Sequence, residues 1–132
     1  MGMFDAINNA GSGLVVYRKW LDAVSDNVSN INDVAPTSGP AFQARYVVAQ
    51  AQDYGNAGGA KVGGIELGSA QGRIVYQPDN PLADKDGNVR LPDIDLADQM
   101  GQLIIAQRAY QANLSVVQRA QDAYQAALGL GK

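Results

Sequence analysis

The chain has no cysteine and no histidine among its 132 residues. The absence of cysteine excludes disulfide bonds, a thiol nucleophile and a zinc site built on thiolates. The absence of histidine removes the commonest general base together with the commonest metal ligand. We therefore expect no enzyme, no metal site and no cofactor.

Positive charge and long apolar runs are also scarce. Lys and Arg together number 10 against 13 Asp and Glu, for a net charge of −3, and no basic patch points to nucleic acid as a partner. There is no apolar run long enough to predict a membrane span. The N-terminal stretch MGMFDAINNAGSG lacks the basic start and apolar core of a cleavable signal peptide.

Two heptad series run through the first segment, from about Phe4 to Ile31. One series is Ile7, Leu14, Leu21 and Val28, and the other, three positions further on, is Ala10, Tyr17, Val24 and Ile31. This spacing predicts a helix with a coiled-coil seam that ends near Asn32. Gly11 and Gly13 each cost about 1 kcal/mol relative to Ala in a helix, a cost that fits close approach of a neighbouring backbone.

A second helix is predicted from about Asp93 to Leu130. One seam position holds Leu96, Leu103, Tyr110, Val117 and Tyr124, and the other holds Met100, Gln107, Leu114, Gln121 and Leu128. Buried polar residues such as the two glutamines can fix register and partner number. Asp93 and Asp95 lie at the start, where negative charge complements the helix dipole.

The middle segment has a different composition, rich in Gly and in β-branched residues. It predicts short strands at Phe42–Gln50, Val62–Leu67, Gly72–Gln77 and Asn88–Leu91, with a turn at Asp86-Gly87. The predicted fold class is mainly α with a small β insert. Residues 1–32 and 93–132 form terminal helices paired as an antiparallel coiled coil, and residues 33–92 form a small β-rich outer domain that is weakly stable alone.

The second helix carries little charge outside its seams, and both helices are rich in amides. Their outer faces hold amides and small polar residues: Asn8, Asn9, Ser12, Ser25, Asn27, Ser29, Asn30, Gln99, Gln102, Gln111, Asn113, Ser115, Gln118 and Gln125. Amides tolerate both water and a protein contact without the desolvation cost of a buried ion. Apolar residues also lie outside the seams, at Val15, Trp20, Ile104, Ile105 and Val116. We therefore predict that the helices bury further surface against neighbouring chains; the alternative is an ordinary two-helix coil that dimerises.

Acidic residues gather before the second helix. Asp84, Asp86 and Asp93 fall on ligand positions of a calcium loop, but Leu82 occupies the first position and cannot ligate through its side chain. A solvent-exposed turn explains the same residues, in which case Asp84→Ala should be nearly silent. Asp93 and Asp95 are paired carboxylates, as glycoside hydrolysis requires, but a helix start also accounts for them.

Three motifs resemble those of a known family. MFDAINNAGSGL followed by DAVSDNVSNIN resembles the N-terminal signature of the flagellar axial proteins, and RAYQANLSVV resembles their C-terminal signature. The stretch GRIVYQPDNPLADKDGNVRLPDIDLADQM is similar to the rod proteins of this family. The matching residues are Val75, Tyr76, Pro78, Pro81, Ala83, Asp84, Gly87, Val89, Pro92, Ile94 and Asp95. Asn32-Asp33, Asn80 and Asn88 depart from the pattern.

The resemblance implies a structural subunit of the proximal rod of the bacterial flagellar basal body. The terminal helices would form the inner tube around the export channel, and the β insert the outer layer. Implied partners are copies of the chain, other rod proteins, the adaptor that joins the rod to the membrane ring, and the type III apparatus that would export the chain without a cleavable signal. Neither nucleic acid nor a small-molecule substrate is implied. The alternative function is a coiled-coil adaptor or secretion chaperone that acts as a dimer.

The expected assembly interface consists of seam residues together with neighbouring aromatic and amide residues. These are Ile7, Leu14, Tyr17, Trp20, Leu21, Val24, Asn27, Val28, Asn30, Ile31, Leu96, Met100, Leu103, Gln107, Tyr110, Asn113, Leu114, Val117, Gln121, Tyr124 and Leu128.

Overall fold

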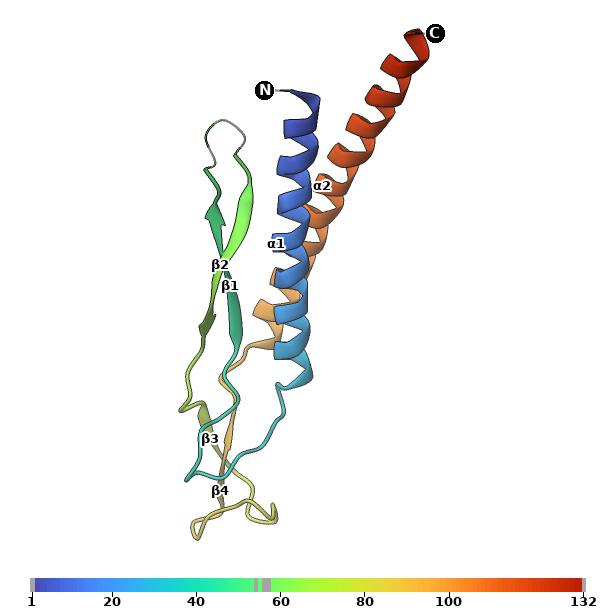
Figure 1. Cartoon of the computed structure of the whole chain (residues 1–132). Coiled ribbons are helices and arrows are strands. Elements are labelled where there is room, and N and C mark those ends of the chain that lie inside the picture. The colour runs from blue at the N-terminus through green and yellow to red at the C-terminus, as the bar shows by residue number, and fades with distance from the viewer. Residues whose placement is uncertain (1, 54, 56–57, 132) are drawn as a thin grey trace. The chain divides into compact units, whose positions relative to one another are not determined.

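A computed structural model describes residues 2–53, 55 and 58–131 of the chain. Within these residues, a long helix comes first, four short strands follow, and a second long helix comes last (Figure 1). The elements are α1 (Met3–Ser29), β1 (Arg45–Ala51), β2 (Ala60–Leu67), β3 (Arg73–Tyr76), β4 (Asn88–Leu91) and α2 (Leu96–Leu130). The predicted fold class, mainly α with a small β insert, is confirmed at this level.

Both helices begin or end close to the predicted positions. α1 ends at Ser29 and passes into a turn that reaches the expected end at Asn32. α2 starts at Leu96 because Asp95 caps it: Asp95 Oδ1 accepts hydrogen bonds from the backbone N–H groups of Ala97 at 2.8 Å and Asp98 at 3.4 Å. The carboxylate predicted to complement the dipole therefore also pairs two N–H groups of the first turn.

The strands form two separate two-stranded sheets, β1-β2 and β3-β4. In the β3-β4 pair, which is antiparallel, Val75 lies opposite Val89. Val89 is buried, whereas Ile74 and Tyr76 on the other face of β3 are exposed, as the two-residue period requires. The predicted Asp86-Gly87 turn is confirmed, since Gly87 has a φ of 79° and its N–H donates to the Asp84 carbonyl at 3.0 Å.

The chain divides into two compact units, and each takes part of both helices and part of the β1-β2 hairpin. The first unit comprises Met1–Leu21, Val47–Gly64 and Ile104–Lys132, and the second comprises Asp22–Tyr46 and Ile65–Leu103. The sequence analysis predicted a different division, into terminal helices (1–32 and 93–132) and an outer β domain (33–92). That division concerns the place of each part in an assembly, so it stays a prediction.

Apolar burial differs between the two units. The second unit has a closed core that includes Ala23, Val24, Ala41, Ala44, Val89, Leu91 and Ile94. Among the described residues of the first unit, the buried apolar side chains are Ala10, Val16 and Ala106. The second unit therefore has the larger apolar core, and the first unit has a thin one.

Candidate assembly surface

Within the first unit, the contacts between α1 and α2 include one near the N-terminus of α1 and one at Gly13. The ring of Phe4 packs edge-on against Tyr124 with centroids 5.5 Å apart, and a Cβ at Gly13 would lie 2.4 Å from Asn113 Nδ2. Residue numbers fall along α2 as they rise along α1, so these segments run antiparallel. Gly13 therefore leaves room for the Asn113 side chain rather than for the neighbouring backbone that was predicted, and a Cβ at Gly11 would meet nothing within 4 Å.

α1 buries a stripe that sequence analysis missed. The spacing between successive members is alternately four and three residues. The members are Asn9, Gly13, Val16, Trp20, Ala23 and Asn27. Gly13, Val16, Ala23 and Asn27 are buried, and the expectation that Asn27 lies on an outer face is wrong because it is only 1% exposed. The stripe has the period of a helix face, but its glycine, alanine and amides have little hydropathy, so apolar spacing alone did not reveal it.

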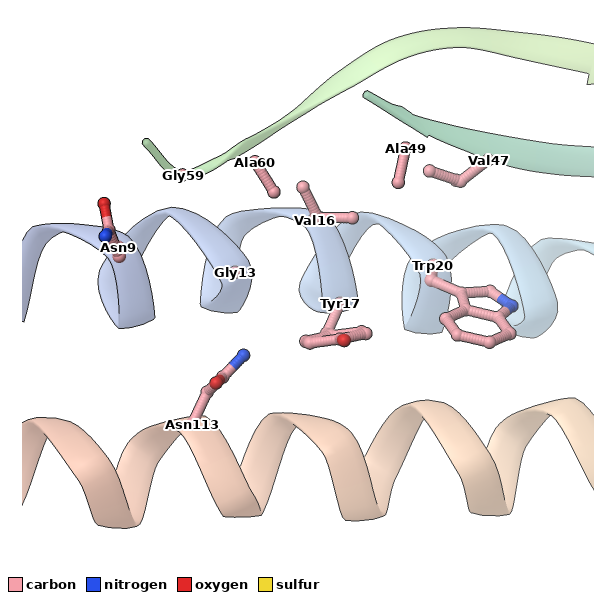
Figure 2. A pocket seen from close by; sticks show the side chains of 10 residues that line it. All are labelled: Asn9, Gly13, Val16, Tyr17, Trp20, Val47, Ala49, Gly59, Ala60 and Asn113. Carbon is pink, nitrogen blue, oxygen red and sulfur yellow. The ribbon is translucent and has the colours of Figure 1, made fainter. Parts of the chain in front are cut away.

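The hairpin of the first unit covers part of this stripe (Figure 2). The backbone N–H of Ala60 donates to Ser12 Oγ at 3.0 Å, and the Ser12 hydroxyl donates to the Asn9 carbonyl at 2.7 Å. A groove of about 460 Å³ remains, lined by Asn9, Gly13, Val16, Tyr17, Trp20, Val47, Ala49, Gly59, Ala60 and Asn113. Its lining carries no charge, so it offers van der Waals surface and amides rather than a site for an ionic ligand.

On α2, one of the two seam positions lies one residue earlier than predicted. The inward stripe comprises Gln99, Leu103, Ala106, Tyr110, Asn113, Val117 and Ala120, all buried or half-buried. Met100, Gln107, Leu114, Gln121 and Leu128, predicted for the second seam position, are exposed in the single chain. The short side chain of Asn113 suits the space beside Gly13 better than that of Leu114 does, which is the physical reason for the shift.

A cluster of buried amides joins three segments inside the second unit. Asn27 Nδ2 donates to Gln99 Oε1 and to the Arg45 carbonyl, both at 3.0 Å, and Asn27 Oδ1 accepts the Arg45 N–H at 2.8 Å. Gln99 was expected on an outer face, and this is wrong because it is 1% exposed. Its Nε2 is buried and has no hydrogen-bond partner within the part of the chain that the structure describes. The cluster fixes the end of α1 against the starts of β1 and α2.

The remaining expected interface residues differ in exposure. Val24 is buried, and Ile7, Leu14, Tyr17, Trp20, Leu21, Val28, Asn30 and Ile31 of the N-terminal segment are half-buried. On α2, Leu96 and Tyr124 are exposed together with the second-seam residues. Much of the expected interface on α2 is therefore free to contact other molecules in the single chain.

Hydrogen bonds to the Asp84 side chain stabilise the acidic turn. Asp84 Oδ1 accepts the N–H groups of Asp86 and Asn88, both at 2.9 Å, and Asp84 Oδ2 accepts the Thr37 hydroxyl at 2.8 Å. The Asn88 N–H, followed by the Thr37 hydroxyl, lowers the pKa of the Asp84 carboxyl. Among the described residues no group of three or more acidic side chains could hold a metal ion. Asp84 therefore organises the turn, so its replacement should cost more than the sequence alone suggested.

The sequence of the chain is similar to that of known proteins over its full length. The family model described as "Flagellar basal body rod FlgEFG protein C-terminal" matches residues 85–130, which include all of α2. The chain is 34% identical to the flagellar basal-body rod protein FlgC of Salmonella typhimurium (strain LT2) and 35% identical to that of Yersinia enterocolitica, over the full length of each chain. It is 30% identical to FlgC of Borreliella burgdorferi over 98% of both chains. The chain belongs to the FlgC family of flagellar basal-body rod proteins.

Membership of the FlgC family confirms the resemblance predicted from the three motifs. It makes the chain a structural protein of the flagellar basal-body rod and not an enzyme. Over the residues described by the structure, neither helix combines the length and apolarity that crossing a bilayer requires.

Proposed function

We propose that the chain is a subunit of the proximal rod and that it assembles through its terminal helices into a tube around the export channel. In this proposal the helices pair as a coiled coil in the inner layer, and residues 33–92 form the outer layer. The subunit contacts copies of itself, other rod proteins and the rod-to-membrane-ring adaptor. It reaches the rod through the flagellar type III export apparatus.

The observation that carries the proposal is the exposed surface of α2, which is rich in apolar and amide side chains and carries little charge. Its exposed apolar side chains include Met100, Ile104, Ile105, Leu114, Val116 and Leu128, and the exposed residues between them are mostly glutamine and alanine. An isolated surface helix normally presents charge to water, and contiguous exposed apolar surface marks an interaction site. A helix packed against other helices on several sides has no need of such charge.

The contrast between the two units supports the same proposal. The first unit combines its thin core with exposed large side chains on both of its helical segments, among them Phe4, Val15 and Ile105. Segments with few buried apolar contacts have low local stability. Neighbouring subunits would supply the missing contacts, so the first unit should become fully ordered only when the rod forms.

The proposal can be tested on basal bodies isolated from the bacterium whose genome encodes the chain. We expect a tagged chain to be recovered in the rod and the Leu21→Asp variant to be absent from it. Leu21 is a half-buried seam residue, so the substitution would bury an unpaired carboxylate. Ser25→Asp is the matched control, because Ser25 is exposed on the same helix. The proposal fails if the wild-type chain is missing from basal bodies or if Leu21→Asp cells assemble rods normally.

The alternative is a coiled-coil adaptor or secretion chaperone that acts as a dimer. It requires a free protein whose helices are already well folded and which has one fixed stoichiometry. The rod proposal instead requires helix content, measured by circular dichroism, to rise when other rod proteins are added. Sedimentation equilibrium of the free chain separates the two, since a stable dimer with unchanged helicity would favour the adaptor.

A further inference from the structure

The charged residues of α2 beyond its first turn lie on one narrow face. At 3.6 residues per turn, Arg108, Arg119 and Asp122 fall within about 60° of one another around the helix axis, and Ser115 lies between them. The inward stripe, which includes Ala106, points about 170° away from this charged face. The charged face is therefore the side of α2 directed away from the rest of its own first unit.

Two uncharged faces flank the charged face on opposite sides. One, the glutamine face, comprises Gln107, Gln111, Leu114, Gln118 and Gln125, which are all exposed. The other, the alanine face, comprises Ile105, Ala109, Val116, Ala123 and Ala127, of which Ala109 is half-buried and the rest are exposed. The centres of the two faces lie about 170° apart, so a single α2 can use both at the same time.

The two faces are complementary in shape. Most residues of the glutamine face are long, whereas most residues of the alanine face are small and allow another helix backbone to come close. Neither face contains an ion, so packing them together carries no cost of charge burial. Amides at the edge of such a contact can pair with each other or with water. The faces also extend over nearly the same stretch of α2, so a partner helix can cover them along their length.

We propose that the glutamine face of α2 in one copy packs against the alanine face of α2 in a second copy, and that the charged face stays in water. A symmetric dimer would use one of these faces twice and leave the other uncovered. A contact between two different faces leaves one of each free and therefore continues from copy to copy. Because it specifies a contact inside the tube described above, this inference rests on the proposed function. It assigns Arg108, Ser115, Arg119 and Asp122 to the water-filled channel.

Three consecutive residues allow a matched test. Leu114 lies on the glutamine face, Ser115 on the charged face and Val116 on the alanine face, and all three are exposed in the single chain, Leu114 by 37% and Val116 by 46%. Each is replaced by Asp in the full chain. The same new charge at the same height of the helix should leave the circular dichroism of the free variants unchanged. We expect loss of rod incorporation for Leu114→Asp and Val116→Asp, and wild-type incorporation for Ser115→Asp.

Disulfide cross-linking identifies the partner. Because the chain has no cysteine, introduced cysteines are the only reactive thiols in it. In basal bodies, Gln111→Cys combined with a cysteine at Ala109, Val116 or Ala123 should give a ladder of linked copies for at least one pair. Gln111→Cys combined with Ser115→Cys should give none. Several alanine-face positions are tried because the axial offset between copies decides which pair comes within disulfide distance.

The outcomes separate this inference from the proposed function. If the wild-type chain is in the rod but Ser115→Asp is excluded, or Val116→Asp is incorporated, the assignment of faces is wrong and the rod function stands. Links to a different protein, or no links from any alanine-face position, overturn the choice of a second copy as partner. Absence of the wild-type chain from rods removes the proposed function itself.

Discussion

Asn27→Ala tests how strongly the stability of the second unit depends on a single amide side chain. The substitution removes three hydrogen bonds: two donated by Asn27 Nδ2 and one accepted by Asn27 Oδ1 from the Arg45 N–H. It leaves the Arg45 N–H, the Arg45 carbonyl and Gln99 Oε1 without those partners. Each buried polar group that loses its partner costs about 1–3 kcal/mol. Because the Arg45 side of the cluster is only partly buried, we take the lower value for each group and expect a loss of about 3 kcal/mol in the free energy of unfolding.

Gln99→Met should cost far less, although Gln99 is as deeply buried. The change leaves one N–H of Asn27 unpaired, at about 1–2 kcal/mol, but it also removes the Gln99 Nε2 donor, which is buried without a partner among the described residues. The two contributions nearly cancel, so we expect a net change within about 1 kcal/mol. Asn30→Ala is the control for helix position, because its hydrogen bond to the Asp26 carbonyl is exposed.

Urea unfolding measures these differences, and hydrogen exchange locates them. The Arg45 amide proton is bonded to Asn27 Oδ1, so it should be protected in the wild-type chain and in Gln99→Met but exchange rapidly in Asn27→Ala. Equal destabilisation by Asn27→Ala and Gln99→Met would mean that Gln99 Nε2 has a partner after all. Persistent protection of Arg45 in Asn27→Ala would refute the arrangement of the amide cluster.

Three further predictions concern the turns and the contact between the helices. Gly13→Ala alone should be nearly neutral, because the gain of about 1 kcal/mol in helix propensity is offset by the contact with Asn113; adding Asn113→Ala should restore that gain in thermal unfolding. Gly72→Ala should destabilise by about 2 kcal/mol or more in urea, because φ is 56° and the new Cβ would lie 2.1 Å from the Leu91 carbonyl oxygen. The lowered pKa of Asp84 stabilises the fold above the unfolded-state value near 3.9, and this contribution is lost as pH falls through the folded-state pKa; Asp84→Ala should therefore flatten the acid side of the stability–pH profile, and an unchanged profile would contradict the hydrogen bonds of the turn.

Local signals were sufficient to predict the elements of the fold. Heptad spacing gave both helices to within a few residues, and β-branched alternation located the four strands. The Asp86-Gly87 pair specified its turn because glycine readily adopts a positive φ. Each of these signals depends on neighbouring residues in the sequence, so no knowledge of distant contacts was needed.

The faces of the helices depended on contacts that the sequence does not mark. On α2, the heptad through Leu114 and the heptad through Asn113 have the same period, and hydropathy favours Leu114. The structure turns Asn113 inward because Gly13 of α1 leaves room for a short side chain. Asn27 and Gln99 were expected to be surface amides, and their burial depends on each other across 72 residues and on the backbone of Arg45. Composition and local spacing do not reveal hydrogen-bond partners that lie so far apart in the sequence.

The many amides of the two helices therefore have two physical origins. In the second unit, amides such as Asn27 replace charge because they are buried and paired inside the chain. In the first unit, the glutamines of α2 and most of its alanines remain exposed. A subunit that stays in water before it assembles cannot present leucine on every face without aggregating, and it cannot present charge on faces that will later be buried. Glutamine and alanine satisfy both conditions, and their high helix propensity favours the conformation that packing requires.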